Sequence, residues 1–254
     1  MARASAELLR RIDAHIVAVT APTRTVRDAG PFRIMVDPAT ELIYLNYAVP
    51  LRAGFDAGSI ALMVDAFNEL GRRPRLEFRR EAWSGLEAEL LRNGFELEAE
   101  QPMMICTPEA FVPASGSEVE VEILGPSGDI EAFCSVADSA FGMNEPVSRE
   151  RIERVRKNIE SRLWICALGR VGGDAAGCAT VTPHDGVCEL AGVGTAARFR
   201  RRGVASAVSS SLLEEHFQTG DLAWLSAGDD VAKAVYERLG FRVAATHVNC
   251  ILAS

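Results

Sequence analysis

Residues Arg200-Arg201-Arg202-Gly203-Val204-Ala205 lie between a strand-like run, residues 187–195, and an apolar helical run that ends near Phe217. This order predicts a loop that leads directly into a helix. The first turn of a helix has backbone N–H groups without intrahelical partners and a partial positive charge, so it suits a phosphate or pyrophosphate. Gly203 lets the backbone approach a ligand closely, and the arginines add charge-assisted donors. An ordinary basic helix start has the same pattern, so these six residues alone leave both interpretations open.

A second motif follows about one strand and one helix later, where Tyr236 stands four residues before the pair Gly240-Phe241. In order, spacing and residue type, the two motifs resemble those of the GNAT acyl-CoA N-acyltransferases over roughly residues 117–254. The resemblance implies an α/β fold (α+β, with a mixed and twisted sheet) and acetyl-CoA as co-substrate, without a metal. It also implies an enzyme that transfers an acetyl or other short acyl group to an amine, by direct attack in a ternary complex.

The resemblance assigns the coenzyme to two parts of the chain. It implies that the pyrophosphate is wrapped by Arg200, Arg201, Arg202, Gly203, Val204 and Ala205. Backbone groups of the preceding strand, at Val193 and Thr195, are expected to meet the pantetheine arm. Asp229 stands where many family members have an asparagine that touches the same arm, and this departure leaves that one contact open.

Two residues are candidates for proton transfer. Tyr236 is expected to act as general acid, because a phenol with a pKa of about 10 can protonate a departing thiolate. A tyrosine that only anchors its helix is the alternative. Glu189 lies eleven residues before Arg200, where some family members carry a catalytic glutamate on the same strand, and it is the candidate for general base. A structural ion pair, with ordered water as the base, is the other interpretation of Glu189.

Proline and glycine are frequent between Thr107 and Ser117, which predicts a linker at residues 111–117 between residues 1–110 and 118–254. The first part repeats the order of the second as a partial copy. When Glu41 is aligned with Glu189, Phe55 falls on Gly203, and a two-residue shift places Leu90 on Tyr236. We therefore expect residues 1–110 to form a non-catalytic GNAT-like domain. It is expected to pack against the catalytic domain and to form one wall of its substrate cleft. Its loss of chemistry also keeps open a second function for the whole chain, a non-catalytic acyl-CoA sensor or structural protein.

Apolar periodicity and turn residues place the expected elements. Helices are expected at residues 4–19, 59–70, 83–92, 129–141, 148–159, 204–217 and 230–239. Strands are expected at residues 74–78, 119–124, 163–168, 175–181, 187–195 and 222–226, followed by a strand pair within residues 241–252.

Composition restricts the class of protein. The 254 residues carry a net charge of −8, which argues against nucleic-acid binding, and no apolar run is long enough to span a membrane. Six cysteines without a Cys-x-x-Cys pair indicate free thiols in a reducing cytoplasm, and the four histidines have no metal-ligand spacing. Cys188, next to Glu189, leaves a covalent acyl-enzyme open. The expected partner is a small-molecule or peptide amine, with Glu145 a candidate contact, and the chain is expected to be a monomer or a homodimer.

Overall fold

The computed structural model describes residues 5–116, 118–143 and 146–253, which form two compact units. The first unit holds residues 5–103, 226–228 and 243–253, and the second unit holds the other described residues. The segment expected as a linker therefore lies within the second unit, and the end of the chain lies in the first.

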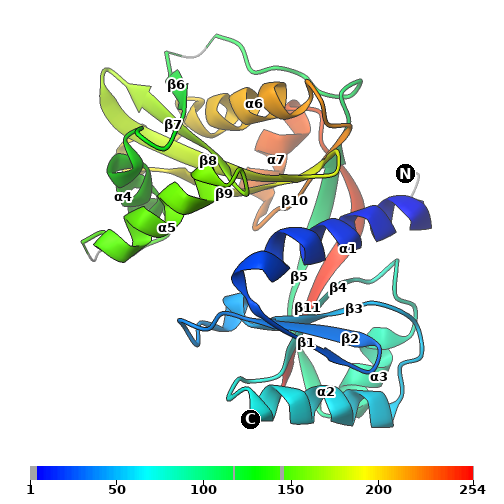
Figure 1. Cartoon of the computed structure of the whole chain (residues 1–254). Helices are drawn as coiled ribbons and strands as arrows, with labels where there is room; N and C mark the ends of the chain where they lie inside the picture. The colour runs from blue at the N-terminus through cyan, green and yellow to red at the C-terminus, as the bar shows by residue number, and fades with distance from the viewer. Residues whose placement is uncertain (1–4, 117, 144–145, 254) are drawn as a thin grey trace. The chain divides into compact units, whose positions relative to one another are not determined.

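The first unit alternates short helices with a sheet whose strand order is β1-β2-β3-β4-β11-β5. Strands β3 and β4 are parallel, whereas β1–β2, β2–β3 and β4–β11 are antiparallel. Figure 1 shows α1 on one side of these strands and α2 and α3 on the other. The elements are α1 (Ala6–Thr20), β1 (Thr25–Ala29), β2 (Phe32–Val36), β3 (Tyr47–Pro50), α2 (Ala57–Glu69), β4 (Arg75–Arg79), α3 (Leu86–Arg92), β5 (Phe95–Cys106) and β11 (Arg242–Leu252).

The two faces of the first unit's sheet differ in polarity. One face is apolar, because Phe32, Phe78 and Val248 pack with Phe67 of α2 and Leu90 of α3 in a fully buried cluster. Side chains alternate along a strand, so the other face of β4 presents charged residues. They are Arg75, Glu77 and Arg79, and Arg79 forms an ion pair with Asp13 of α1. This unit therefore buries charge beside strand β4.

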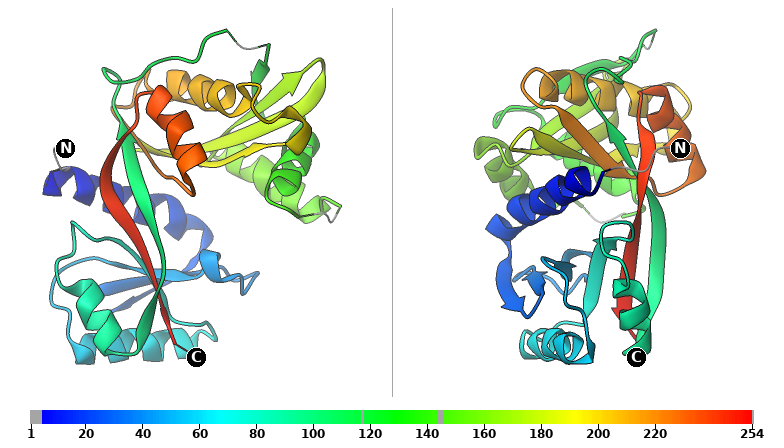
Figure 2. Two further views of the ribbon diagram at one scale, coloured as in Figure 1. Left: turned by 180° about the vertical axis from the view of Figure 1, so that it is seen from behind. Right: turned by 90° about the vertical axis from the view of Figure 1, so that its right-hand side faces the viewer.

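The second unit is a mixed sheet with strand order β10-β9-β8-β7-β6. Among the strands described in this unit, only β9 and β10 run parallel to each other. Helices α4 and α5 cover one face and α6 covers the opposite face (Figure 2). The elements are β6 (Glu120–Ile123), α4 (Ile130–Ala140), α5 (Arg149–Glu160), β7 (Ile165–Val171), β8 (Asp174–His184), β9 (Val187–Thr195), α6 (Val204–His216), β10 (Leu222–Ser226) and α7 (Asp230–Arg238).

The expected internal copy is present as a fold. The order β3-α2-β4-α3-β5 repeats as β9-α6-β10-α7-β11, and α2 and α6 each contain 13 residues. The residue before α2 is Asp56 and the residue before α6 is Gly203, so these two are the structural counterparts, one position away from the alignment made on sequence. The mixed sheet and the tandem arrangement are confirmed.

One expectation about the end of the chain is wrong. Residues 241–252 do not form a strand pair, because β11 is a single strand whose residues 247–251 all pair with β4. Strands β9 and β10 match their expected bounds, and α6 ends one residue earlier than expected.

Candidate functional site

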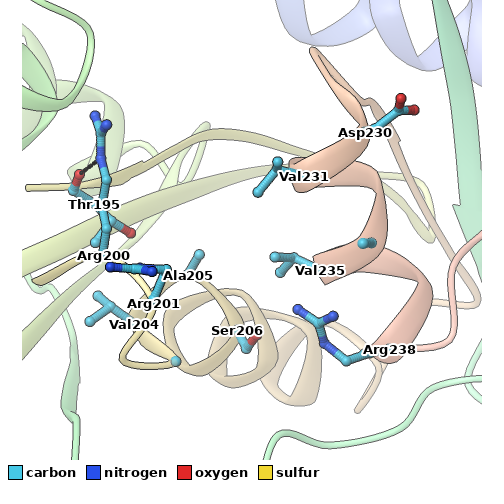
Figure 3. A pocket seen from close by; sticks show the side chains of 12 residues that line it. Thr195, Arg200, Arg201, Val204, Ala205, Ser206, Asp230, Val231, Val235 and Arg238 are labelled. Atoms are coloured by element: carbon cyan, nitrogen blue, oxygen red, sulfur yellow. Dashed lines mark hydrogen bonds between the residues drawn. The ribbon is translucent and has the colours of Figure 1, made fainter. Parts of the chain in front are cut away.

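A cavity of about 740 Å³ lies in the second unit, where the start of α6 faces one side of α7 (Figure 3). Six of the residues expected to bind a coenzyme line it: Thr195, Arg200, Arg201, Gly203, Val204 and Ala205. The remaining lining residues come mostly from α7 and were missed by the sequence analysis: Ser206, Asp230, Val231, Ala234, Val235 and Arg238. Their spacing of three and four residues on α7 is the signal that could have found them.

The loop before α6 has the backbone shape of an anion site. A short 3₁₀ turn, Ala197–Phe199, leads into Arg200. Arg201 and Gly203 both have left-handed backbone, with φ of 63° and 79°. Left-handed residues in a turn direct successive N–H groups into one concavity, which binds phosphate and other anions. Glycine is the residue that holds φ of 79° without strain.

The backbone N–H groups in the first turn of α6 receive no hydrogen bond from a capping side chain. Among the described residues no side chain caps this helix. In contrast, a serine or aspartate side chain accepts a hydrogen bond from the first turn of five other helices; these caps are Ser5, Asp56, Asp129, Ser148 and Asp229. The first three residues of α6 line the cavity, so their N–H groups are available to a bound anion.

A glycine on β8 seats the start of α6 close to the sheet. A Cβ atom at Gly177 would lie 2.3 Å from Cγ1 of Val204 and 2.9 Å from the carbonyl oxygen of Gly194. Val204 is the first residue of α6, and it is 2% exposed. The position of the loop before α6 therefore depends on the absence of a side chain at Gly177.

Cationic side chains meet the cavity from both helices. Arg200 and Arg201 lie at the start of α6, and Arg238 reaches toward the same space from α7 (Figure 3). Arg200 donates from Nε to the carbonyl oxygen of Thr195 over 3.5 Å, which leaves its terminal nitrogens to other acceptors. No ion pair of Arg201 or Arg238 with a described residue is found. This cluster of positive charge favours an anionic ligand.

The other arginines of the loop have acidic partners. Arg198 pairs with Asp174 at 3.0 Å and Arg202 with Glu118 at 3.5 Å. Both guanidinium groups lie over the ring of Phe199, at 4.7 and 5.7 Å from its centre. Arg202, expected to bind the pyrophosphate, is therefore not among the residues that line the cavity.

Strands β9 and β10 separate in the middle of the second unit. Their pairing ends at Trp224 and Glu189, and the rest of β9 continues to Thr195 without a β10 partner. A register shift against β8 follows at Gly192, whose φ is 59°. The unpaired edge of residues 190–195 leaves backbone groups that can accept an extended ligand as an added strand would. Val193 lies on this edge, and Glu189 marks the point where the strands part.

Tyr236 lies on a different side of α7 from the cavity. It is 8% exposed and packs edge-to-face on Phe241, with ring centres 5.9 Å apart. Burial, and next the nearby charge of Asp229, raise the pKa of Tyr236 to about 12. The phenol is therefore protonated at neutral pH, as a proton donor must be. Asp229 caps α7 through Ala232 N and does not line the cavity.

The cysteines of the site are buried thiols. Cys188 is fully buried, and burial raises the pKa of its thiol well above the ordinary value. Because the thiolate is the nucleophilic form, this environment opposes a covalent acyl-enzyme at Cys188. No group of three potential metal ligands, and no helix long and apolar enough to cross a membrane, is found in the described part of the chain. Glu145, the expected acceptor contact, lies outside the described residues.

Comparison with known proteins identifies this region. Residues 130–241, which include the cavity, match the model of the acetyltransferase (GNAT) family. A GCN5-related N-acetyltransferase from Kribbella flavida has a similar structure, with a TM-score of 0.80 and 24% identity over 97% of this chain and 96% of that one. No curated protein sequence matches the chain.

Two more distant structures have the same fold. A GCN5-related N-acetyltransferase from Sphaerobacter thermophilus has a TM-score of 0.64 and 16% identity, over 90% of this chain and 83% of that one. A tandem GNAT protein from the clavulanic acid biosynthesis pathway has a TM-score of 0.65 and 13% identity, over 100% of this chain and 91% of that one. At such identities the similarity shows the fold, a tandem of GNAT units.

Proposed function

We propose that this GNAT protein is an N-acyltransferase that moves an acetyl group, or another short acyl group, from acyl-CoA to an amine in a ternary complex. The observation that carries this proposal is the open N-terminus of α6 in a cavity lined by Arg200, Arg201 and Arg238. Such an arrangement fits the pyrophosphate of a coenzyme, because backbone N–H groups and guanidinium groups line the same cavity.

The residues present fit the other parts of acyl-CoA as well. The unpaired edge of β9, with Val193 and Thr195, would hold the pantetheine arm through backbone hydrogen bonds. When bound, the thioester supplies an already activated acyl group. The work left to the protein is to position the amine, to remove its proton and to protonate the thiolate.

Tyr236 is proposed as the acid. Its raised pKa keeps the proton on the phenol at neutral pH, which is the form that a proton donor needs. The side chain would have to meet the thiolate on the side of α7 away from the cavity. Glu189 is proposed as the base that takes the amine proton directly or through water, because it lies where β9 and β10 part. The acceptor class remains amines in general, from small molecules to peptides. The free thiols suit a reducing compartment such as the cytoplasm.

A non-catalytic acyl-CoA binder is the second candidate. The burial of Tyr236, and its absence from the cavity lining, favour this alternative, since a sensor needs the coenzyme site and not the acid.

Release of CoA thiol from acetyl-CoA, followed in the presence of a panel of amines, tests the proposal. We expect Tyr236→Phe to lower kcat about 100-fold, the usual contribution of a general acid, with the Kd for acetyl-CoA within about twofold of the original. Glu237→Gln, at an exposed position on the same helix outside the cavity lining, is the control for general damage to α7. Binding of acetyl-CoA without thiol release for any amine would support the sensor instead.

A further inference from the structure

A cavity of about 360 Å³ is lined by residues of the first unit alone. It lies between α1 and the carboxyl ends of β3 and β4, since Pro50 ends β3 and Trp83 follows β4 by four residues. These two strands run parallel, with Ala48 paired to Leu76. In an open α/β sheet, ligands bind outside the carboxyl ends of parallel strands. The cavity therefore has the position of a ligand site, and its volume suits a small molecule.

The wall of this cavity is largely apolar. Five of the lining residues are aliphatic or aromatic: Ala14, Val17, Pro50, Leu51 and Trp83. Two contacts hold the indole of Trp83 in place. Its ring lies edge-on to Phe55, with ring centres 5.9 Å apart, and its Nε1 donates a hydrogen bond to Asp13 Oδ2 over 2.8 Å. A ring or a branched chain of a ligand can pack on this fixed surface.

Asp13 is the acidic residue of the lining, and its carboxylate already has partners. Oδ2 accepts from Trp83, and Oδ1 forms an ion pair with Arg79 of β4. Burial raises the pKa of Asp13, whereas the charge of Arg79 and the hydrogen bond from Trp83 act in the opposite direction. The ionised carboxylate is balanced by Arg79, and the protonated form carries no charge. Asp13 therefore gives the cavity no net negative charge to attract a cation.

Two arginines add positive charge at this place. Arg79 is fully buried, and its Nε and Nη1 have no hydrogen-bond partner among the described residues. A single ion pair leaves most of the five donors of a guanidinium group unused, which is costly in a buried place. Arg10 lines the cavity from α1 and is exposed, and no ion pair that joins it to a described residue is found. Two guanidinium groups thus stand beside one carboxylate, which favours an anionic group on the ligand.

We propose that this cavity binds a small carboxylate with an aromatic or branched apolar body. The carboxylate meets the guanidinium of Arg10, and the nearby charge of Arg79 strengthens the attraction. The body packs on the indole of Trp83 and on Pro50 and Leu51. An amine of the same shape gains no ionic partner here, because Asp13 is already paired. The site is separate from the coenzyme cavity of the second unit, and it does not depend on the acyltransferase function proposed above.

Titration of the full-length protein with phenylacetate tests this site. The protein is labelled with ¹⁵N-tryptophan, and Trp83→Phe assigns the Trp83 signal among the three indole resonances. We expect phenylacetate to shift the Trp83 resonance in a saturable way, with a Kd of about 1 mM or lower. Phenylacetamide, which has the same shape without the charge, and 2-phenylethylamine should bind at least 10-fold more weakly. No shift with phenylacetate, or equal affinities for the three probes, would overturn the proposal.

Two variants test the arginine and the cavity separately. Arg10→Gln should weaken phenylacetate binding about 10-fold, and Arg27→Gln, an arginine of β1 outside the lining, is the matched control with an unchanged Kd. Ala14→Trp fills the cavity from the exposed side of α1 without a change of charge. It should abolish binding while the circular dichroism spectrum stays the same. Binding that both Arg10→Gln and Ala14→Trp leave intact would place phenylacetate elsewhere and overturn the proposal.

Discussion

Helices α2 and α6 begin at corresponding places in the two units, and they satisfy their first turns in opposite ways. At α2, Asp56 accepts from Ser59 N at 2.7 Å, and Ser59 Oγ accepts from Asp56 N at 3.0 Å, a capping box that occupies both partners. At α6, Gly203 has no side chain, and the N-terminus opens on a cationic cavity. The same position at the start of a helix therefore holds a carboxylate in the first unit, and in the second unit it lacks one, as the proposed binding of an external anion requires.

The surroundings of the two helix starts agree with this difference. Phe55, before Asp56, stacks on Phe32 with ring centres 5.6 Å apart and lies edge-on to Trp83. Aromatic packing and a negative charge both disfavour phosphate there. In the second unit, Arg200 and Arg201 line the cavity, and they stand three and two positions before Gly203. This difference supports the proposal that the coenzyme binds at the start of α6 and not at the start of α2.

Giving α6 a carboxylate of its own should have the largest effect. Gly203→Asp places an acidic cap at a helix start that now has none, and we expect the Kd for acetyl-CoA to rise at least 100-fold by calorimetry. The substitution also strains a left-handed position, at a cost of about 1 kcal/mol. Gly71→Asp, at φ of 64° with nothing near its Cβ, is the matched control for that strain. Equal loss of affinity in both variants would contradict the comparison.

Displacing the start of α6 should have the next largest effect. Gly177→Ala forces Val204 away from β8, and we expect a loss of about 1–3 kcal/mol in the free energy of unfolding, together with weaker acetyl-CoA binding. Gly125→Ala, where a Cβ would meet nothing within 4 Å, should change neither quantity. Chemical denaturation and calorimetry measure both. If Gly177→Ala destabilised the protein but left the affinity for acetyl-CoA unchanged, the position of α6 would not matter for coenzyme binding.

Removing one cation from α7 should have a smaller effect. Arg238→Ala is expected to raise the Kd for acetyl-CoA about 10-fold, the value of one charge-assisted contact of about 1.4 kcal/mol. Arg198→Ala is the control, because that guanidinium already pairs with Asp174 and lies outside the cavity lining. The difference between the two variants should shrink as salt is added. If the two substitutions changed the Kd for acetyl-CoA equally, Arg238 would not be a residue that contacts the coenzyme.

Removing the cap of α2 should have the smallest effect. Asp56→Ala is expected to lower the free energy of unfolding by about 1 kcal/mol and to leave the Kd for acetyl-CoA unchanged. Thermal unfolding with and without acetyl-CoA measures both quantities. If this variant bound a second equivalent of acetyl-CoA, the first unit would retain a usable coenzyme site. That result would contradict the difference proposed between the starts of α2 and α6.

The sequence alone predicted those parts of the candidate site that are formed by one continuous stretch of backbone. The loop from Arg200 to Ala205, and the strands on either side of α6, follow from local patterns of apolar, glycine and basic residues. Arg238 was missed because only the packing of α7 beside α6 brings it to the cavity. Strand β11 was misjudged because its partner, β4, lies more than 160 residues away in the chain.

The most direct test of the central claim is a calorimetric titration of acetyl-CoA into the wild-type protein and into a variant that carries Arg200→Glu and Gly203→Glu. We expect the wild type to bind one equivalent at micromolar Kd and the variant to show no measurable binding, with both proteins equally folded by circular dichroism. Equal binding by the two proteins would contradict the claim that the start of α6 is the coenzyme site.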